Sequence, residues 1–107
     1  GILAPAGVAR KGIAMSDRSV HVLISGMLQG VGYRSWLAQL ADSYELGGWV
    51  REPMTGEIEA VFSGPSEVVA EIIAECRKGP RGANVTSVSV QEQSRPASGP
   101  FEVRESI

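Results

Sequence analysis

Three glycines, a glutamine and an arginine lie together in the stretch GMLQGVGYR, residues 26–34, between a strand-like and a helix-like run. Glycine lets consecutive peptides turn so that their N–H groups converge on one point. The first N–H groups of a helix have no partner inside it, and the helix dipole favours an anion there. Arg34 falls in the first turn of the predicted helix, and a guanidinium binds a tetrahedral oxyanion bidentately. These residue types predict a phosphate-binding loop.

A flexible connector that ends in a surface arginine is the competing interpretation of the same glycines. The stretch contains neither the GxxxxGK[ST] motif of a nucleotide P-loop nor the spacing of a dinucleotide-binding loop. The helix dipole disfavours an arginine in the first turn, and a bound phosphate would compensate for it. The glycine-rich bend taken alone leaves both interpretations open.

The elements around this bend follow from hydrophobic periodicity and from turn residues. The predicted order is a strand at 20–25, a helix after the bend, strands at 47–52 and 57–63 around the turn PMTG, a helix at 66–78, a strand at 83–92 and a short strand at 101–105. One apolar face of the first helix consists of Tyr33, Trp36, Leu37, Leu40, Ala41 and Tyr44. Two strand–helix–strand halves bury most apolar surface as an α+β, ferredoxin-like two-layer sandwich (βαββαβ), with an antiparallel sheet and both helices on one face.

The motifs themselves resemble a known family. GMLQGVGYR is similar to the signature of the acylphosphatases, roughly G-x-V-Q-G-V-x-F-R. GGWVREPMTGEIEAVFSGP resembles the second block of that family, and GPSEVV…CRKGPRGANV resembles the helix and strand beyond, so the resemblance covers residues 20–104. The family has the same ferredoxin-like fold, and its members hydrolyse acyl phosphates to carboxylate and inorganic phosphate with neither metal nor cofactor.

The resemblance also implies which residues bind and act on the substrate. Carried over by position, phosphate binding falls to the backbone N–H groups of Gln29, Gly30, Val31, Gly32, Tyr33 and Arg34. The Arg34 side chain would pair with the same phosphoryl oxygens. Because the carboxylate of an acyl phosphate leaves easily, positioning and charge stabilisation matter more than strong base catalysis.

Glu52 is the most consequential departure from the family pattern. It stands directly after GWVR, where the family has an asparagine that holds the attacking water. An amide both donates to and accepts from that water, whereas an ionised carboxylate only accepts and repels the phosphate. We therefore expect a weakened acylphosphatase, with Glu52 acting as general base or losing its charge as the alternatives. A non-catalytic phosphate-binding module of the same fold is the second hypothesis, and without ligand we expect Arg34 and Glu52 to pair.

Two smaller departures concern turns. Glu45 stands where the family often has glycine after the first helix, so a positive φ there would cost on the order of 1 kcal/mol. Thr55 replaces the usual aspartate of the turn between the middle strands, which we expect to matter little.

Other residues that carry chemistry in many proteins are expected to be structural. We predict that His21 is structural and that Cys76 is a buried, inert thiol. The side chains of Trp36, Tyr44 and Trp49 are assigned to the core, and those of Arg51, Glu57 and Glu59 to the solvated face of the sheet.

Composition limits the partners. A formal net charge of −2 argues against nucleic acid, and no apolar run approaches the about 20 residues of a membrane span. Single-stranded RNA binding, which this sandwich supports elsewhere, is disfavoured because the strands lack an aromatic–basic motif. Cys76 is the one cysteine, in keeping with a reducing cytoplasm. We expect a cytoplasmic monomer in which residues 1–17 are a leader and residues 18–107 form the domain.

Overall fold

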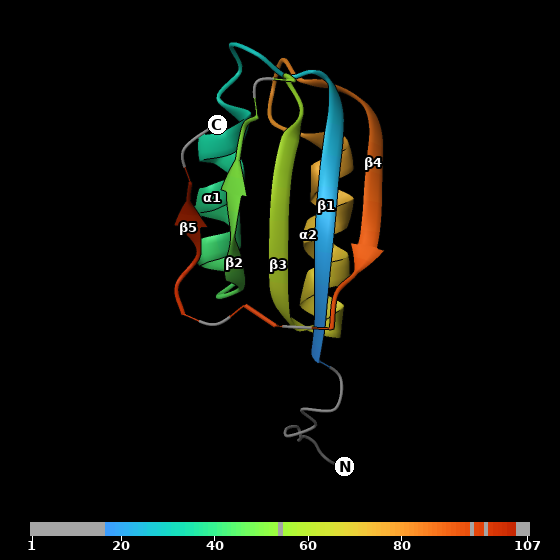
Figure 1. The fold of residues 1–107 in the computed structure, drawn as a ribbon. Helices are drawn as coiled ribbons and strands as arrows, with labels where there is room; N and C mark the ends of the chain where they lie inside the picture. Colours follow the sequence, from blue (N-terminus) through green and yellow to red (C-terminus); the bar gives the residue numbers. More distant parts are fainter. Residues whose placement is uncertain (1–16, 54, 95, 98, 105–107) are drawn as a thin grey trace.

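The computed structural model describes residues 17–53, 55–94, 96–97 and 99–104. Its elements follow the chain as β1 (Asp17–Met27), α1 (Tyr33–Ser43), β2 (Gly47–Arg51), β3 (Ile58–Pro65), α2 (Ser66–Lys78), β4 (Asn84–Glu92) and β5 (Glu102–Val103). The strands form one sheet in the order β4-β1-β3-β2-β5, and both helices cover the same face of it (Figure 1). The ferredoxin-like sandwich predicted from the element order is confirmed.

One strand departs from the predicted antiparallel sheet. The pairs β1–β3, β1–β4 and β2–β3 are antiparallel, whereas β5 pairs with β2 in parallel. The connection from β4 crosses the end of the sheet before β5 begins, so β5 enters the sheet edge in the same direction as β2 (Figure 1). The sheet is therefore mixed, because a crossover rather than a hairpin leads to its last strand.

The core lies between the sheet and the helices. On β1 the side chains of Val20, Val22 and Ile24 are fully buried and alternate with residues on the open face. The other strands and the helices contribute Leu37, Ala41, Val50, Ile58, Ala60, Phe62, Val69 and Ile72. Burial of this apolar surface, at about 25 cal/mol per Å², is the main force that holds the helices to the sheet.

The three aromatic residues assigned to the core behave differently. Trp36 and Tyr44 are partly buried and pack against the core, whereas Trp49 lies on the open face of the sheet. The guanidinium groups of Arg51 and Arg104 lie 5.3 and 4.8 Å from the Trp49 ring centroid. The prediction for Trp49 is wrong because the strand alternation places Gly48 and Val50, its neighbours, on the helix side.

Two boundaries bear on the predictions. Asp17 was assigned to the leader, but it is the first residue of β1 and pairs with Pro65. The rest of that leader, residues 1–16, lies outside the described residues.

Glu45 has φ +59°, the left-handed conformation expected at this position. Among the residues that the structure describes, it is the one non-glycine residue with a positive φ. No helix within the described ranges is both long and apolar enough to cross a membrane.

Candidate active site

The loop between β1 and α1 begins at a break in the sheet. The pairing of β1 with β4 shifts register between Ser25 and Gly26, and Gly26 has φ +141°. A Cβ on Gly26 would lie 2.1 Å from the carbonyl oxygen of Asn84, so no other residue fits there. This bulge turns the chain out of β1 toward α1.

The glycines further along the loop face open space. Gly30 and Gly32 have φ of +78° and +72°, and a Cβ on either would meet no atom within 4 Å. Glycine is therefore required there by backbone conformation and not by crowding. The loop keeps a free volume in front of its peptides.

Helix α1 starts without the groups that usually satisfy a helix N-terminus. Gly32 is the N-cap, no side chain caps the first turn, and the first turn contains no acidic residue. The first intrahelical bond seen here runs from the Trp36 N–H to the Gly32 carbonyl, at 2.9 Å. The N–H groups of Tyr33, Arg34 and Ser35 precede it, so they are available to an anion at the positive end of the helix dipole.

A hollow of about 300 Å³ opens at this helix start. It is lined by Leu28, Gln29, Gly30, Gly32, Tyr33, Arg34, Ser35 and Glu52. The structure thus brings together the predicted site residues, including Glu52, which is 18 positions beyond Arg34 in the sequence. Val31 is the exception, because its side chain packs against the core and a Cβ on Gly82 would lie 3.3 Å from its Cγ1.

Two residues of the hollow were not singled out from the sequence. Leu28, only 3 % exposed, supplies an apolar wall, and Ser35 places a hydroxyl in the first turn of α1. Ser35 could have been predicted from its position, because it follows Arg34 directly in the first turn of the helix. No sequence signal distinguished Leu28 from an ordinary loop residue.

Glu52 reaches the hollow from the end of β2. It is the first residue after that strand and is followed by Pro53, which biases the preceding residue toward an extended backbone. Glu52 and Arg34 are both half-buried. The cations of the ion pairs among the described residues are Arg18, His21, Arg51, Lys78 and Arg104, so the expected Arg34–Glu52 pair does not form.

Tyr33 holds the start of α1 against the end of α2. Its side chain is 2 % exposed, and its hydroxyl donates a hydrogen bond of 2.7 Å to the Cys76 carbonyl. Burial raises the pKa of the Tyr33 hydroxyl well above its ordinary value, so it stays protonated as a donor. Burial also raises the pKa of the Cys76 thiol to about 12, and the prediction of a buried, unreactive thiol is confirmed.

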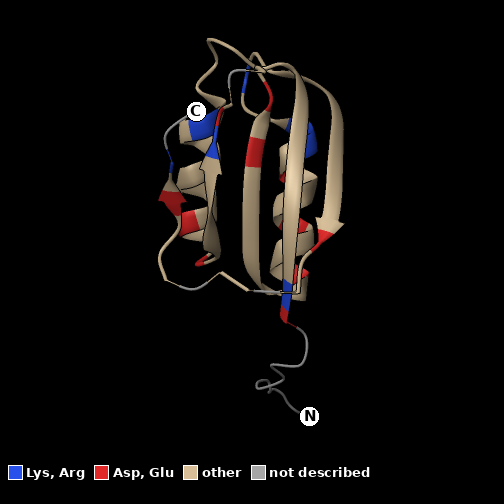
Figure 2. Cartoon of the chain, in the orientation of Figure 1, with Lys and Arg blue, Asp and Glu red and all other residues tan. Residues whose placement is uncertain are grey.

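Positive charge gathers at the end of the molecule that holds the hollow. Arg77 and Lys78 close α2 beside the Tyr33 contact, and Arg81 follows in the connection to β4. Figure 2 shows much of the Lys and Arg colouring at this end, although the whole chain carries a formal charge of −2. A local cationic field of this kind attracts small anions toward the hollow.

The open face of the sheet is not simply solvated. Arg51 Nε donates a 2.6 Å hydrogen bond to Glu59 Oε1, and His21 Nε2 lies 2.6 Å from Glu59 Oε2. Glu59 exposes only 14 % of its side chain, so the predictions of a solvated Arg51 and Glu59 are wrong. Glu57 is half-buried and accepts a bond of 3.0 Å from the Ser25 hydroxyl. His21 is structural as predicted, with Glu59 as its partner.

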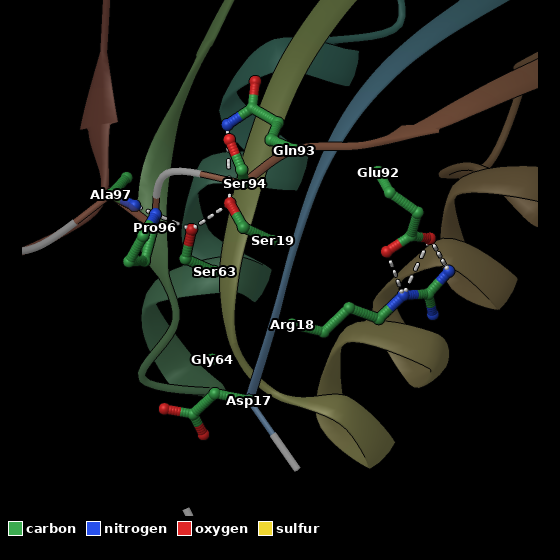
Figure 3. A pocket seen from close by; sticks show the side chains of 10 residues that line it. All are labelled: Asp17, Arg18, Ser19, Ser63, Gly64, Glu92, Gln93, Ser94, Pro96 and Ala97. Atoms are coloured by element: carbon green, nitrogen blue, oxygen red, sulfur yellow. Dashed lines mark hydrogen bonds and ion pairs between the residues drawn. The ribbon is translucent and has the colours of Figure 1, made fainter. Parts of the chain in front are cut away.

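A second, larger hollow of about 450 Å³ lies at the opposite end of β1 (Figure 3). The hydroxyls of Ser19 and Ser63 lie 2.7 Å apart, and the Ala97 N–H donates a 2.9 Å bond to Ser63 Oγ. Arg18 donates through Nε and Nη2 to the Glu92 carboxylate, with the shortest contact 2.6 Å. Because these groups bind one another, the second hollow is the weaker candidate for binding a phosphate.

No metal site emerges from the side chains. Within the part of the chain that the structure describes, no group of three His, Cys, Asp or Glu residues lies close enough to hold an ion. The candidate site therefore consists of backbone amides, one arginine, one serine hydroxyl and one carboxylate around a small hollow.

The fold is a ferredoxin-like sandwich with a glycine-rich loop and a hollow before its first helix, and comparisons with known proteins give the family. Residues 20–103 match the family model for acylphosphatase. An acylphosphatase of Rhodopseudomonas palustris (strain BisB5) is 46 % identical over 83 residues, which cover 78 % of this chain and 84 % of that protein. The chain belongs to the acylphosphatase family of hydrolases.

Two further comparisons agree with this membership. An acylphosphatase of Moorella thermoacetica is 38 % identical over 93 residues, which cover 87 % of this chain and all of that protein. The solved structure of an acylphosphatase from Coxiella burnetii superposes with a TM-score of 0.81 at 27 % identity, covering 89 % of this chain and all of that one. The fold and the family therefore extend over nearly all of the described residues.

Proposed function

We propose that this chain hydrolyses acyl phosphates to carboxylate and inorganic phosphate in the hollow at the start of α1, with a turnover limited by Glu52. The observation that carries the proposal is that Glu52 and Arg34 line the same hollow as the glycine-rich loop. The proposal includes a cytoplasmic location and a monomeric state, and sedimentation of the purified chain would test the monomeric state.

The phosphoryl group is bound by the loop and by the first turn of α1. The N–H groups from Gln29 to Arg34 supply donors, and the uncapped dipole of α1 adds a fixed positive potential. Arg34 supplies the full positive charge and a bidentate donor pair. In phosphoryl transfer such positioning and charge stabilisation provide most of the rate acceleration.

Glu52 opposes this binding when it is ionised. A carboxylate about 4 Å from a phosphoryl oxygen repels each unit of its negative charge by about 4 kcal/mol at an effective dielectric constant of 20. That energy is of the same size as the attraction from Arg34, so bound substrate is destabilised. The carboxylate also cannot donate a hydrogen bond to the attacking water, as the family's asparagine does.

Two variants at this position separate charge from shape. Glu52→Asn is expected to raise kcat/KM for benzoyl phosphate by at least about tenfold, equal to about 1.4 kcal/mol. Glu52→Gln removes the charge but keeps the length of the side chain, so it should recover part of the gain. The ultraviolet absorbance of benzoyl phosphate follows the reaction directly. An unchanged or lower kcat/KM for Glu52→Asn contradicts the repulsion argument.

General-base catalysis by Glu52 predicts a different outcome. A base that accepts a proton from water must be ionised, so activity would fall at acid pH with the pKa of the carboxyl. Both Glu52→Asn and Glu52→Gln would then lose about 10²-fold or more. The pH profile of the native chain and the two variants together decide between repulsion and base catalysis.

A phosphate-binding module without catalysis is the second candidate, and Glu52 is again the observation that favours it. Such a module would bind inorganic phosphate at the loop and leave benzoyl phosphate intact. Titration calorimetry with phosphate, beside the hydrolysis assay, distinguishes the two functions. Binding without turnover in the native chain and in Glu52→Asn would establish the module.

A further inference from the structure

The open face of the sheet carries a chain of charged side chains that ends beside the hollow. Arg51 on β2, Glu59 on β3 and His21 on β1 join three neighbouring strands through two contacts of 2.6 Å to the Glu59 carboxylate. Glu59 exposes 14 % of its side chain, and His21 and Arg51 expose 28 % each. We refer to His21, Arg51 and Glu59 as the cross-strand cluster.

The cluster ends at the residue before Glu52. Arg51 is the last residue of β2, and its backbone partner in the β2–β3 ladder is Glu59 itself. Arg51 and Glu59 are therefore held together twice, by their side-chain hydrogen bond and by the last backbone pairing between β2 and β3. Glu52 follows at once and is restricted on its other side by Pro53, whose ring favours an extended conformation before it.

Aromatic contacts restrict Arg51 further. Its guanidinium lies 5.3 Å from the Trp49 ring centroid, within the range of a cation–π contact. The guanidinium of Arg104 lies 4.8 Å from the same ring, and the Arg104 N–H donates a 2.8 Å bond to the Val50 carbonyl. The end of β2 is thus held from β3 on one side and from Arg104, the residue after β5, on the other.

We propose that the cross-strand cluster is a positioning device that sets where residue 52 stands in the hollow. None of the three members lines the hollow, so they are positioning residues and not catalytic ones. This inference rests on the proposed function, because residue 52 must act on the reaction for its placement to matter.

The charge state of the cluster supports a fixed geometry. Burial opposes ionisation of Glu59, but hydrogen bonds from Arg51 and His21 outweigh it and lower the pKa of Glu59 below its ordinary value. Glu59 is therefore an anion at neutral pH. Charge-assisted hydrogen bonds of this kind are shorter and stronger than neutral ones, which favours one arrangement of the Arg51 side chain.

A double-mutant cycle between positions 52 and 59 tests the proposal. Glu59→Gln is made in the native chain and in Glu52→Asn, and kcat and KM for benzoyl phosphate are measured in all four proteins. In Glu52→Asn we expect Glu59→Gln to lower kcat by about tenfold with KM changed less, because an asparagine that orients water depends on its placement. In the native chain we expect a change of at most about threefold, because a repelling carboxylate gains nothing from exact placement.

The Arg18–Glu92 pair provides a matched control at the far end of β1. It is also an arginine–carboxylate contact with a shortest distance of 2.6 Å between neighbouring strands, β1 and β4. Glu92→Gln should change kcat by the same small factor in both backgrounds. If Glu59→Gln lowers kcat only because it loosens the whole sheet, Glu92→Gln should lower kcat as well, and each variant should do so in both the native chain and Glu52→Asn.

The proposal is overturned if Glu59→Gln lowers kcat by the same factor in the native chain and in Glu52→Asn. Should Glu59→Gln fail to fold, as judged by circular dichroism, Arg51→Lys takes its place in the same cycle, since it keeps the charge but loses the guanidinium geometry. If Glu52→Asn alone brings no gain in kcat/KM, the proposed limit that Glu52 sets on turnover fails. The positioning role is still decided, because it depends on whether Glu59→Gln lowers kcat by different factors in the native chain and in Glu52→Asn.

Discussion

The two ends of β1 each carry a hollow with an arginine in its wall, but the two arginines are used differently. At one end, Arg34 is absent from the ion pairs of the described residues and stands beside an uncapped helix start. At the other end, Arg18 is bound to Glu92 and the serine hydroxyls bind each other (Figure 3). In the larger hollow the polar groups thus bind one another, whereas the smaller hollow lies at a helix start whose first N–H groups have no capping side chain.

This difference shows why size is a poor guide to function in this chain. A polar group that already has a protein partner gains little from a ligand, because the ligand must first displace that partner. Donors fixed by a backbone turn and by a helix start need no such displacement. On this ground we propose the 300 Å³ hollow, and not the 450 Å³ hollow, as the anion site.

We expect the largest difference in activity between the two ends when their arginines, Arg34 and Arg18, are replaced by alanine. Arg34→Ala should lower kcat/KM for benzoyl phosphate by about 10³-fold or abolish activity, because it removes the full positive charge of the hollow. Arg18→Ala should leave activity within about twofold and change stability by no more than about 1 kcal/mol, since its partner Glu92 is well exposed. Steady-state kinetics on both variants make the comparison, and equal losses would remove the distinction between the ends.

An intermediate effect, on stability alone, is expected at the second hollow. Ser63→Ala takes away the partner of the Ala97 N–H and one partner of the Ser19 hydroxyl, both close to the chain crossover toward β5. The free energy of unfolding should fall by about 1–3 kcal/mol, with kcat/KM unchanged. Urea denaturation and the hydrolysis assay check the two halves of this statement. A loss of turnover in a fully stable Ser63→Ala protein would show that the second hollow takes part in function.

The smallest effect is expected at a residue that belongs to neither hollow. Glu45, exposed in the link from α1 to β2, has φ +59°, which an L-residue adopts at a cost. Glu45→Gly should raise the free energy of unfolding by about 1 kcal/mol and leave kcat/KM as it is. Thermal unfolding measures the change. Asp42→Gly, three residues earlier inside α1, is the matched control and should instead destabilise by up to about 1 kcal/mol.

The helices and the loop were predictable because their signals are local. The 66–78 helix agrees with the observed α2, and the loop glycines, which were expected to let the chain turn, have positive φ values. Helix periodicity, caps and glycine conformations depend on residues within a few positions of one another. The resemblance to a family then indicated position 52, which no local pattern marks.

The pairings across the sheet were not predictable in the same way. Arg51 and Glu59 were assigned to solvent because each faces away from the helices, yet they bind each other and His21 on that face. Which side chains meet on an open sheet face depends on strand order and register, and neither appears in any single strand. The parallel direction of β5 likewise depends on the connection that leads to it and not on the residues of the strand itself.

By itself, then, the amino-acid sequence determined the elements, the sandwich they form and the glycine-rich loop before α1. Tertiary structure alone decided that Glu52 stands in the same hollow as Arg34, and that side chains of three strands meet at the Glu59 carboxylate on the open face of the sheet. The physical reason is distance along the chain. His21 and Glu59, 38 positions apart, and Arg34 and Glu52, 18 positions apart, come together only after the strands have paired, and no local preference encodes this.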